Sequence, residues 1–143
     1  MKPNNVAYRK CTDTSFYKEW LSFLTPFHGL ANRECDVAAR ILEQYFRLSE
    51  SIKDPDVLRE VMWSKTSKND MLKSLGMSVH QFYGILRKLR SIGFIADDTV
   101  NARFLPHKTD EPRVMLQVIF DWSSPTKPII RNEAANNKGA AAV

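Results

Sequence analysis

The stretch KNDMLKSLGMSVHQFYGILRKLRSIGFI, residues 68–95, constrains the fold more than any other part of the chain. Apolar residues repeat at helical spacing on both sides of Gly76, a residue type that adopts the left-handed conformation cheaply. Ser78 is placed to cap a second helix, and Gly93 is placed to end it. The pattern predicts a helix-turn-helix. The inward side chains of its second helix are expected to be Phe82, Leu86 and Leu89.

Three apolar patterns precede this pair. SFYKEWLSFLTPF suits a helix with Phe16, Trp20 and Leu24 on one face, and its aromatic residues also suit a strand. LANRECDVAARILEQYFRLSES predicts a helix of about 16 residues that ends near Ser49. Asp54 before Pro55 then marks the start of a short helix. Its apolar face is expected to be Val57, Leu58, Val61 and Met62, and Ser67 is expected to cap the helix that follows.

Two strand-like stretches follow the pair, TVNARFLP at 99–106 and RVMLQVIFD at 113–121. The polar link HKTDEP is typical of a hairpin loop, so the pattern predicts a wing. The expected fold is therefore mainly α with a small β-hairpin, a winged helix-turn-helix over 15–122. Two polar arms flank it, at 1–14 and 123–143, and neither has enough apolar residues to fold on its own.

Composition and motifs exclude several classes of function. Hydrophobic residues make up 43% of the chain, enough for a real core, while no apolar run is long enough for a membrane span. The chain has no signal-peptide pattern and its two cysteines have no metal-ligand spacing, so we expect a soluble protein that is made in a cytoplasm. No catalytic constellation, phosphate-binding loop or cofactor motif is present. We therefore expect a protein that is not an enzyme and needs no cofactor.

The helix pair suggests double-stranded DNA as one partner. The second helix of such a pair lies in the major groove, and cations around it hold phosphates. A net charge of +5 allows a polyanionic partner and is also ordinary for a soluble protein. In the alternative interpretation, LRKLR is only the solvated side of an amphipathic helix. The candidate DNA-binding residues are Lys68, Lys73, Ser78, His80, Gln81, Tyr83, Arg87, Lys88, Lys108 and Arg113.

The arms and the many aromatic residues suggest protein partners instead. Arms that cannot fold alone gain order when apolar anchors are buried on neighbouring subunits, and aromatic residues are common anchors at interfaces. The alternative is that the aromatic residues form a second layer of the core. The candidate interface anchors are Tyr8, Trp122, Ile129 and Ile130.

Three stretches carry a resemblance to a known family: LANRECDVAARIL, MLKSLGMSVHQFYGILRKLRSIGFI and NARFLP with VMLQVIFD. They resemble small winged-helix proteins of tailed bacteriophages, especially crAss-like phages, over about residues 28–120. The chain departs from the family pattern at Ala31 and Asn32, where Thr and Pro are usual, and Asn32 is then expected to cap the helix. The positions that match are Leu30, Glu34, Leu75, Gly76, Met77, Ser78, Gly93, Asn101, Arg103, Phe104, Leu105 and Pro106.

The resemblance implies either a DNA-binding regulator or a structural part of a phage particle. We favour the second as an expectation: a virion assembly component near the portal or the head-tail connector. It would work in a multi-copy assembly with other phage structural proteins, and would be made in the host bacterial cytoplasm. A double-stranded DNA-binding winged-helix transcriptional regulator is the alternative.

Overall fold

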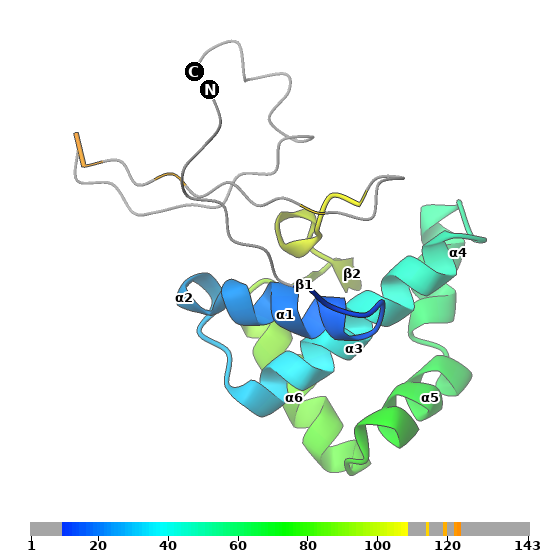
Figure 1. The fold of residues 1–143 in the computed structure, drawn as a ribbon. Coiled ribbons are helices and arrows are strands. Elements are labelled where there is room, and N and C mark those ends of the chain that lie inside the picture. The colour runs from blue at the N-terminus through cyan, green and yellow to red at the C-terminus, as the bar shows by residue number, and fades with distance from the viewer. Residues whose placement is uncertain (1–9, 109–113, 115–118, 120–121, 124–143) are drawn as a thin grey trace.

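Six α-helices precede a short β-hairpin in the described part of the chain, which is residues 10–108 with 114, 119, 122 and 123 of a computed structural model. The fold is therefore mainly helical with a small two-stranded antiparallel sheet, as expected (Figure 1). The elements are α1 (Ser15–Phe23), α2 (Thr25–His28), α3 (Asn32–Ser49), α4 (Pro55–Met62), α5 (Lys65–Leu75), α6 (Val79–Ser91), β1 (Ile95–Ala96), β2 (Thr99–Val100) and the 3-10 turn η1 (Ala102–Phe104).

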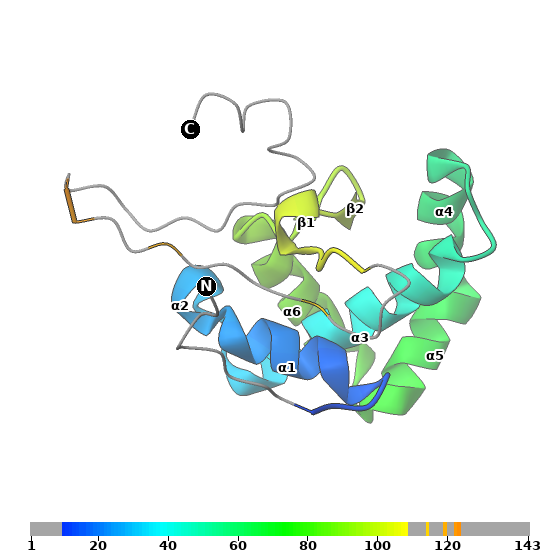
Figure 2. The same ribbon diagram turned by 45° about the horizontal axis from the view of Figure 1, so that its top comes forward.

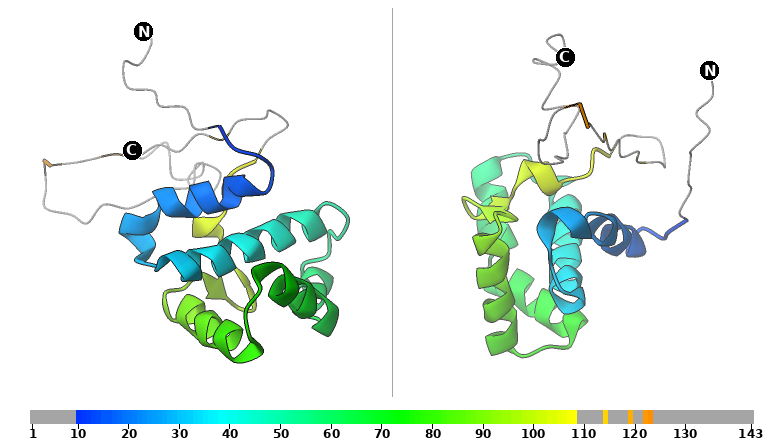
Figure 3. Two further views of the ribbon diagram at one scale, coloured as in Figure 1. Left: turned by 60° about the horizontal axis from the view of Figure 1, so that its bottom comes forward. Right: turned by 90° about the vertical axis from the view of Figure 1, so that its left-hand side faces the viewer.

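Helix α3 is the centre of the fold, and α1 and α6 lie on opposite sides of it (Figure 3). Its apolar stripe leaves Val37, Ile41 and Leu42 with no exposed surface, because both flanking helices pack on it. The expected inward face of α6 is confirmed: Phe82, Leu86 and Leu89 are all fully buried. The other side chains with 1% exposure or less are Leu21, Leu24, Ala38, Met62, Met71 and Phe94.

Helix starts follow the capping rules, with two corrections. The caps expected at Asp54 and Ser78 are confirmed, since each side chain accepts a backbone N–H of the first turn. The cap of α5 is Ser64 and not Ser67, because Ser67 is buried and donates its hydroxyl to the Val61 carbonyl. Helix α3 does not start from an Asn32 cap. Asn32 is its first helical residue, and the Glu34 carboxylate instead accepts the N–H of Ala31.

Two expected apolar faces are partly wrong. In α1 the buried residues are Tyr17 and Leu21, whereas Phe16 and Trp20 are half-buried. Trp20 sits at the margin because its indole N–H donates to the Phe104 carbonyl at 2.9 Å. In α4 only Met62 is fully buried, and Val57 is 43% exposed because this short helix touches the core at its C-terminal end.

The hairpin is shorter than expected and lies earlier in the chain, at the C-terminal end of α6 (Figure 2). Its strands β1 and β2 are joined by Asp97 and Asp98, with φ angles of 53° and 56°, the left-handed values that a two-residue hairpin turn needs. The expected strand over 99–106 ends at Val100. There the Asn101 side chain accepts the N–H of Arg103 and starts η1. Most of the second expected strand, 113–121, lies outside the described residues.

An aromatic cage on the α1–α3 side holds the ammonium of Lys108. The Lys108 Nζ lies 5.8, 5.1 and 5.1 Å from the ring centres of Phe16, Tyr17 and Phe46. It also donates to the Tyr17 hydroxyl at 3.0 Å. Because aromatic faces attract a cation, this cage ties the segment after η1 to α1 and α3.

Replacing Leu86 with Ala should destabilise the domain by about 2–5 kcal/mol, the usual cost of truncating a fully buried leucine. The free energy of unfolding from a urea titration measures this change. Val79→Ala on the same helix is the control, since Val79 is 55% exposed and its truncation should cost little. Equal effects of the two substitutions would mean that the packed face of α6 is wrongly assigned.

Replacing Lys108 with Met should lower stability by about 0.5–2 kcal/mol, because Met keeps the length of the side chain and loses the charge that the cage attracts. The same urea titration measures the change. Lys10→Met is the matched control, because Lys10 is exposed. No difference between the two variants would show that the cage contributes packing alone.

Candidate nucleic-acid interface

The positive charge of the chain is concentrated in α5 and α6. Residues 65–91 hold six Lys or Arg residues and one acidic residue, Asp70. Their net charge of +5 equals the formal net charge of the whole chain, so the other residues together are neutral. The helix pair thus carries a surplus of positive charge, which favours the approach of a polyanion.

These cations face solvent and are not neutralised locally. Five of them are exposed and Lys68 is half-buried; the exposed ones are Lys65, Lys73, Arg87, Lys88 and Arg90. Among the described residues, every ion pair lies within α1, α3 and α4, and none includes a residue of α5 or α6. The charge of the helix pair therefore remains available to a partner.

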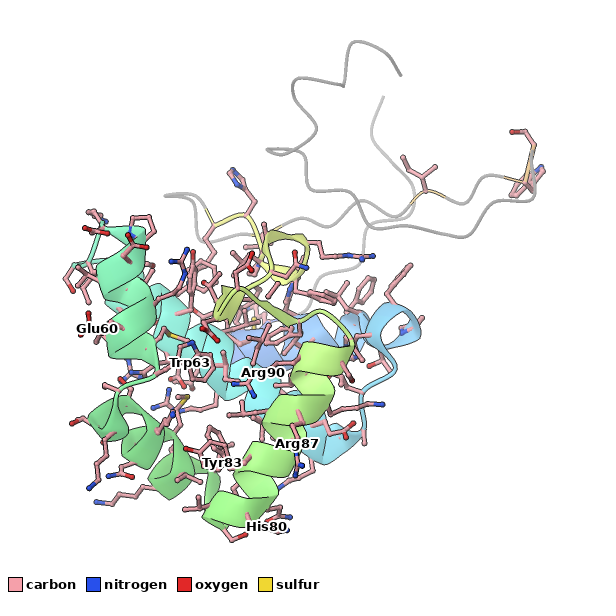
Figure 4. All side chains as sticks on the ribbon, turned by 180° about the vertical axis from the view of Figure 1, so that it is seen from behind. Glu60, Trp63, His80, Tyr83, Arg87 and Arg90 are labelled. Carbon is pink, nitrogen blue, oxygen red and sulfur yellow. The ribbon has the colours of Figure 1, made fainter. Side chains whose placement is uncertain are left out.

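One exposed stripe runs along α6. His80, Tyr83, Arg87 and Arg90 follow one another at intervals of three, four and three residues, which places them on one side of the helix. Figure 4 shows the four side chains in this order along α6. The second half of the stripe, Arg87 and Arg90, is cationic. We call these four residues the α6 stripe.

Helix α5 extends the surface beside the middle of the stripe. The Lys68 ammonium lies 5.4 Å from the ring centre of Tyr83 and 3.4 Å from its hydroxyl oxygen. Lys65 precedes Lys68 by three residues, on the same side of α5. Lys73 follows Lys68 by five residues, which turns it to another side of the helix.

The remaining sequence candidates on α6 lie off the stripe. The Ser78 hydroxyl accepts the N–H of Gln81 at 3.2 Å and so serves as the helix cap. Gln81 and Lys88 are exposed and seven residues apart, which puts them on a second line beside the stripe. Gly84 has no heavy atom within 4 Å of the place a Cβ would take, so the surface is open there.

A chain of polar contacts fixes α5 against α3. Arg40 donates to Ser74 Oγ at 2.8 Å and to Gln44 Oε1 at 2.9 Å. Gln44 in turn donates to Ser67 Oγ at 3.4 Å. Burial lowers the pKa of the Arg40 guanidinium, while Glu43 nearby acts in the opposite direction. Because buried polar groups need specific partners, this chain sets the position of α5 and with it that of Lys65 and Lys68.

The structure brings together most, but not all, of the residues expected to bind DNA. Lys108 lies in the cage on the α1–α3 side and not beside α6, and Arg113 lies outside the described residues. Arg90 was missed. It lies ten residues after His80, at intervals of three, four and three residues through Tyr83 and Arg87, and this helical spacing indicates that it shares their side of α6.

Of the expected interface anchors, only Trp122 lies in the described part of the chain, with 92% of its surface exposed. Tyr8, Ile129 and Ile130 lie outside it, as do most residues of the two expected arms. Within the described residues there is no group of three or more His, Cys, Asp or Glu side chains that is able to hold a metal ion. None of the described helices has the length and apolar character to cross a membrane.

Comparison with known proteins finds no relative of this chain. A scan against family models, a search of curated proteins and a search of solved structures each find no match to this chain.

Proposed function

We propose that the protein binds double-stranded DNA through α5 and α6, used as a helix-turn-helix, with the rest of the domain as a winged-helix scaffold. One observation carries the proposal: the two helices hold a net charge equal to that of the entire chain. Neutralising DNA phosphates with Lys and Arg releases bound counterions, which is the main source of affinity in such complexes.

The α6 stripe suits the major groove. A groove of B-DNA admits one α-helix, and the first turns of that helix meet the base edges. In α6 those turns present His80 and Tyr83, with Gln81 beside them, and Gly84, which has open space where a Cβ would lie, allows a close approach. Gln is able to pair with adenine through two hydrogen bonds. Base reading would therefore depend on a few side chains and be modest.

The cations are placed to hold the backbone on either side of the groove. Arg87 and Arg90 lie on the second half of the stripe, and Lys88 lies beside it. Lys65 and Lys68 approach from α5. Contacts of this kind fix the orientation of a protein on the duplex without reading its sequence. We therefore expect binding that is mostly electrostatic.

The double substitution Arg87→Ala with Lys88→Ala should weaken binding to all duplexes alike, by about tenfold or more near 0.1 M salt, because two phosphate contacts are lost. Fluorescence anisotropy with a labelled mixed-sequence duplex, repeated over a range of salt concentrations, measures both the affinity and its salt dependence. The slope of log K against log salt should become shallower by about two.

Lys10→Ala with Lys53→Ala is the matched control, since it removes two exposed cations outside α5 and α6. Equal losses in the two double variants would show that net charge alone matters and that α6 is not the contact surface. A strong preference for one duplex that disappears in Gln81→Ala would instead support a sequence-specific regulator.

A second candidate is a bacteriophage virion assembly component near the portal or connector. Large exposed aromatic surfaces favour it: Trp122 is 92% exposed and Phe23 is 62% exposed. Single exposed apolar residues are ordinary, but exposed Trp is a preferred anchor at protein interfaces. The resemblance to phage winged-helix proteins supports the same reading.

Deleting residues 123–143 tests this second candidate. The melting temperature of the isolated protein should stay nearly unchanged, while incorporation into phage particles should fall. Mass spectrometry of purified particles, with the full-length chain as control, measures the incorporation. Undiminished incorporation of the truncated chain, or absence of the full-length chain from particles, would count against the assembly role.

A further inference from the structure

The turn of the hairpin carries two adjacent carboxylates and is held in place. Asp97 and Asp98 are both exposed, and both have left-handed φ angles. The indole N–H of Trp63 donates to the backbone carbonyl of Asp98 at 2.6 Å. This hydrogen bond fastens the turn to the end of α4, so the backbone that carries the two carboxylates is held at a defined place on the surface.

That place adjoins the C-terminal end of the α6 stripe. Asp98, Trp63 and Glu60 line a surface hollow together with Arg90 and Lys68. Figure 4 shows Trp63 and Glu60 on α4, across from Arg90 on α6. Asp56 and Arg59 also line the hollow, and the two form an ion pair at 2.7 Å, which removes them from the charge balance. Among the described residues, Glu60, Asp97 and Asp98 at this edge form no ion pair, and Lys68 and Arg90 line the same hollow as Glu60 and Asp98.

Neither carboxylate of the turn is required by its backbone conformation. Among the described residues, no ion pair joins them to Arg90 or Lys68. The turn needs residues that tolerate a left-handed backbone, and Asn does so as well as Asp. The hydrogen bond from Trp63 uses a backbone carbonyl and not a carboxylate. The shape of the hairpin therefore does not explain why both residues of its turn carry a negative charge.

We infer that Asp97 and Asp98 repel the phosphate backbone, so that this hairpin does not act as a DNA-contacting wing and duplex DNA is confined to α5 and to α6 as far as Arg90. The inference rests on the proposed function. A phosphate that follows α6 beyond Arg90 approaches the fixed turn, and like charges about 10 Å apart still repel at moderate salt. The turn thereby sets one boundary of the contact and the direction in which the duplex crosses the domain.

The test is the double variant Asp97→Asn with Asp98→Asn. It should bind a short mixed-sequence duplex about two- to fivefold more tightly than the unmodified protein at low salt, and the difference should shrink as salt rises. Fluorescence anisotropy measures the affinity. The control variant, Asp13→Asn with Glu50→Gln, also removes two exposed carboxylates, and both lie outside α5, α6 and the hairpin. It should change affinity less than the turn variant does.

Three results separate the possibilities. If the unmodified protein shows no salt-dependent duplex binding, the proposed function itself fails. If it binds, and the turn variant binds no better than the control variant, DNA binding stands and the inference is wrong. Weaker binding by a turn variant whose urea midpoint is unchanged would also overturn it, because the turn would then help to hold the DNA. The single variants Asp97→Asn and Asp98→Asn serve if the double variant is unstable.

Discussion

Burial of α3 on both sides is the constraint on which the rest of the fold depends. Val37, Ile41 and Leu42 have no exposed surface, which requires α1 on one side and α6 on the other. Removing this apolar surface from water is the main source of stability. With its inner face committed to α3, α6 must present His80, Tyr83, Arg87 and Arg90 to solvent. The candidate DNA-binding surface is thus the outer side of a helix whose inner side builds the core.

The two sides of α3 differ in how their cations are held. On the α1 side, the ammonium of Lys108 lies among aromatic rings, and Lys18 is paired with Asp36. On the α6 side, the cations have no acidic partner among the described residues. A modest net charge of +5 is therefore not spread thinly over the surface. Concentrated on two adjacent helices, it gives a polyanion one preferred side to approach.

Local rules predicted the helix pair well, because its signals are local. Gly76 with its positive φ, the Ser78 cap and the buried Phe82, Leu86 and Leu89 can each be recognised from neighbouring residues. The predictions were wrong where contacts between residues far apart in the sequence determine the local structure. In α1 Tyr17 and Leu21 are buried in the core, while Trp20 is bonded to Phe104, 84 residues away. The place of Lys108 depends on rings from two helices. The hairpin over 95–100 was not expected, because two aspartates in left-handed conformation are a weaker turn signal than a glycine.

The candidate site could be predicted only in part for the same reason. Arg87 and Lys88 were recognised from their place on α6, and the spacing along the same helix also points to Arg90. The link between Lys68 and Tyr83 emerges only when α5 and α6 are set side by side. The charge surplus of the pair is visible in the sequence. Its significance depends on the structure, which shows that Asp36, Glu43 and Asp56 pair with cations of α1, α3 and α4. Among the described residues, no ion pair includes a cation of α5 or α6.

The contacts that hold the outer face of α1 have a consequence for how the chain folds. Trp20 is joined to Phe104 across 84 residues, and Tyr17 to Lys108 across 91. Contacts so far apart in sequence carry a large loop-closure cost and form late. During synthesis α1 emerges first and meets α3 soon afterwards, yet its aromatic face stays uncovered until the chain has been made as far as residue 108. A ribosome-bound chain that stops before this point exposes Phe16 and Trp20, which a chaperone is able to bind, and completion of the domain removes that binding site.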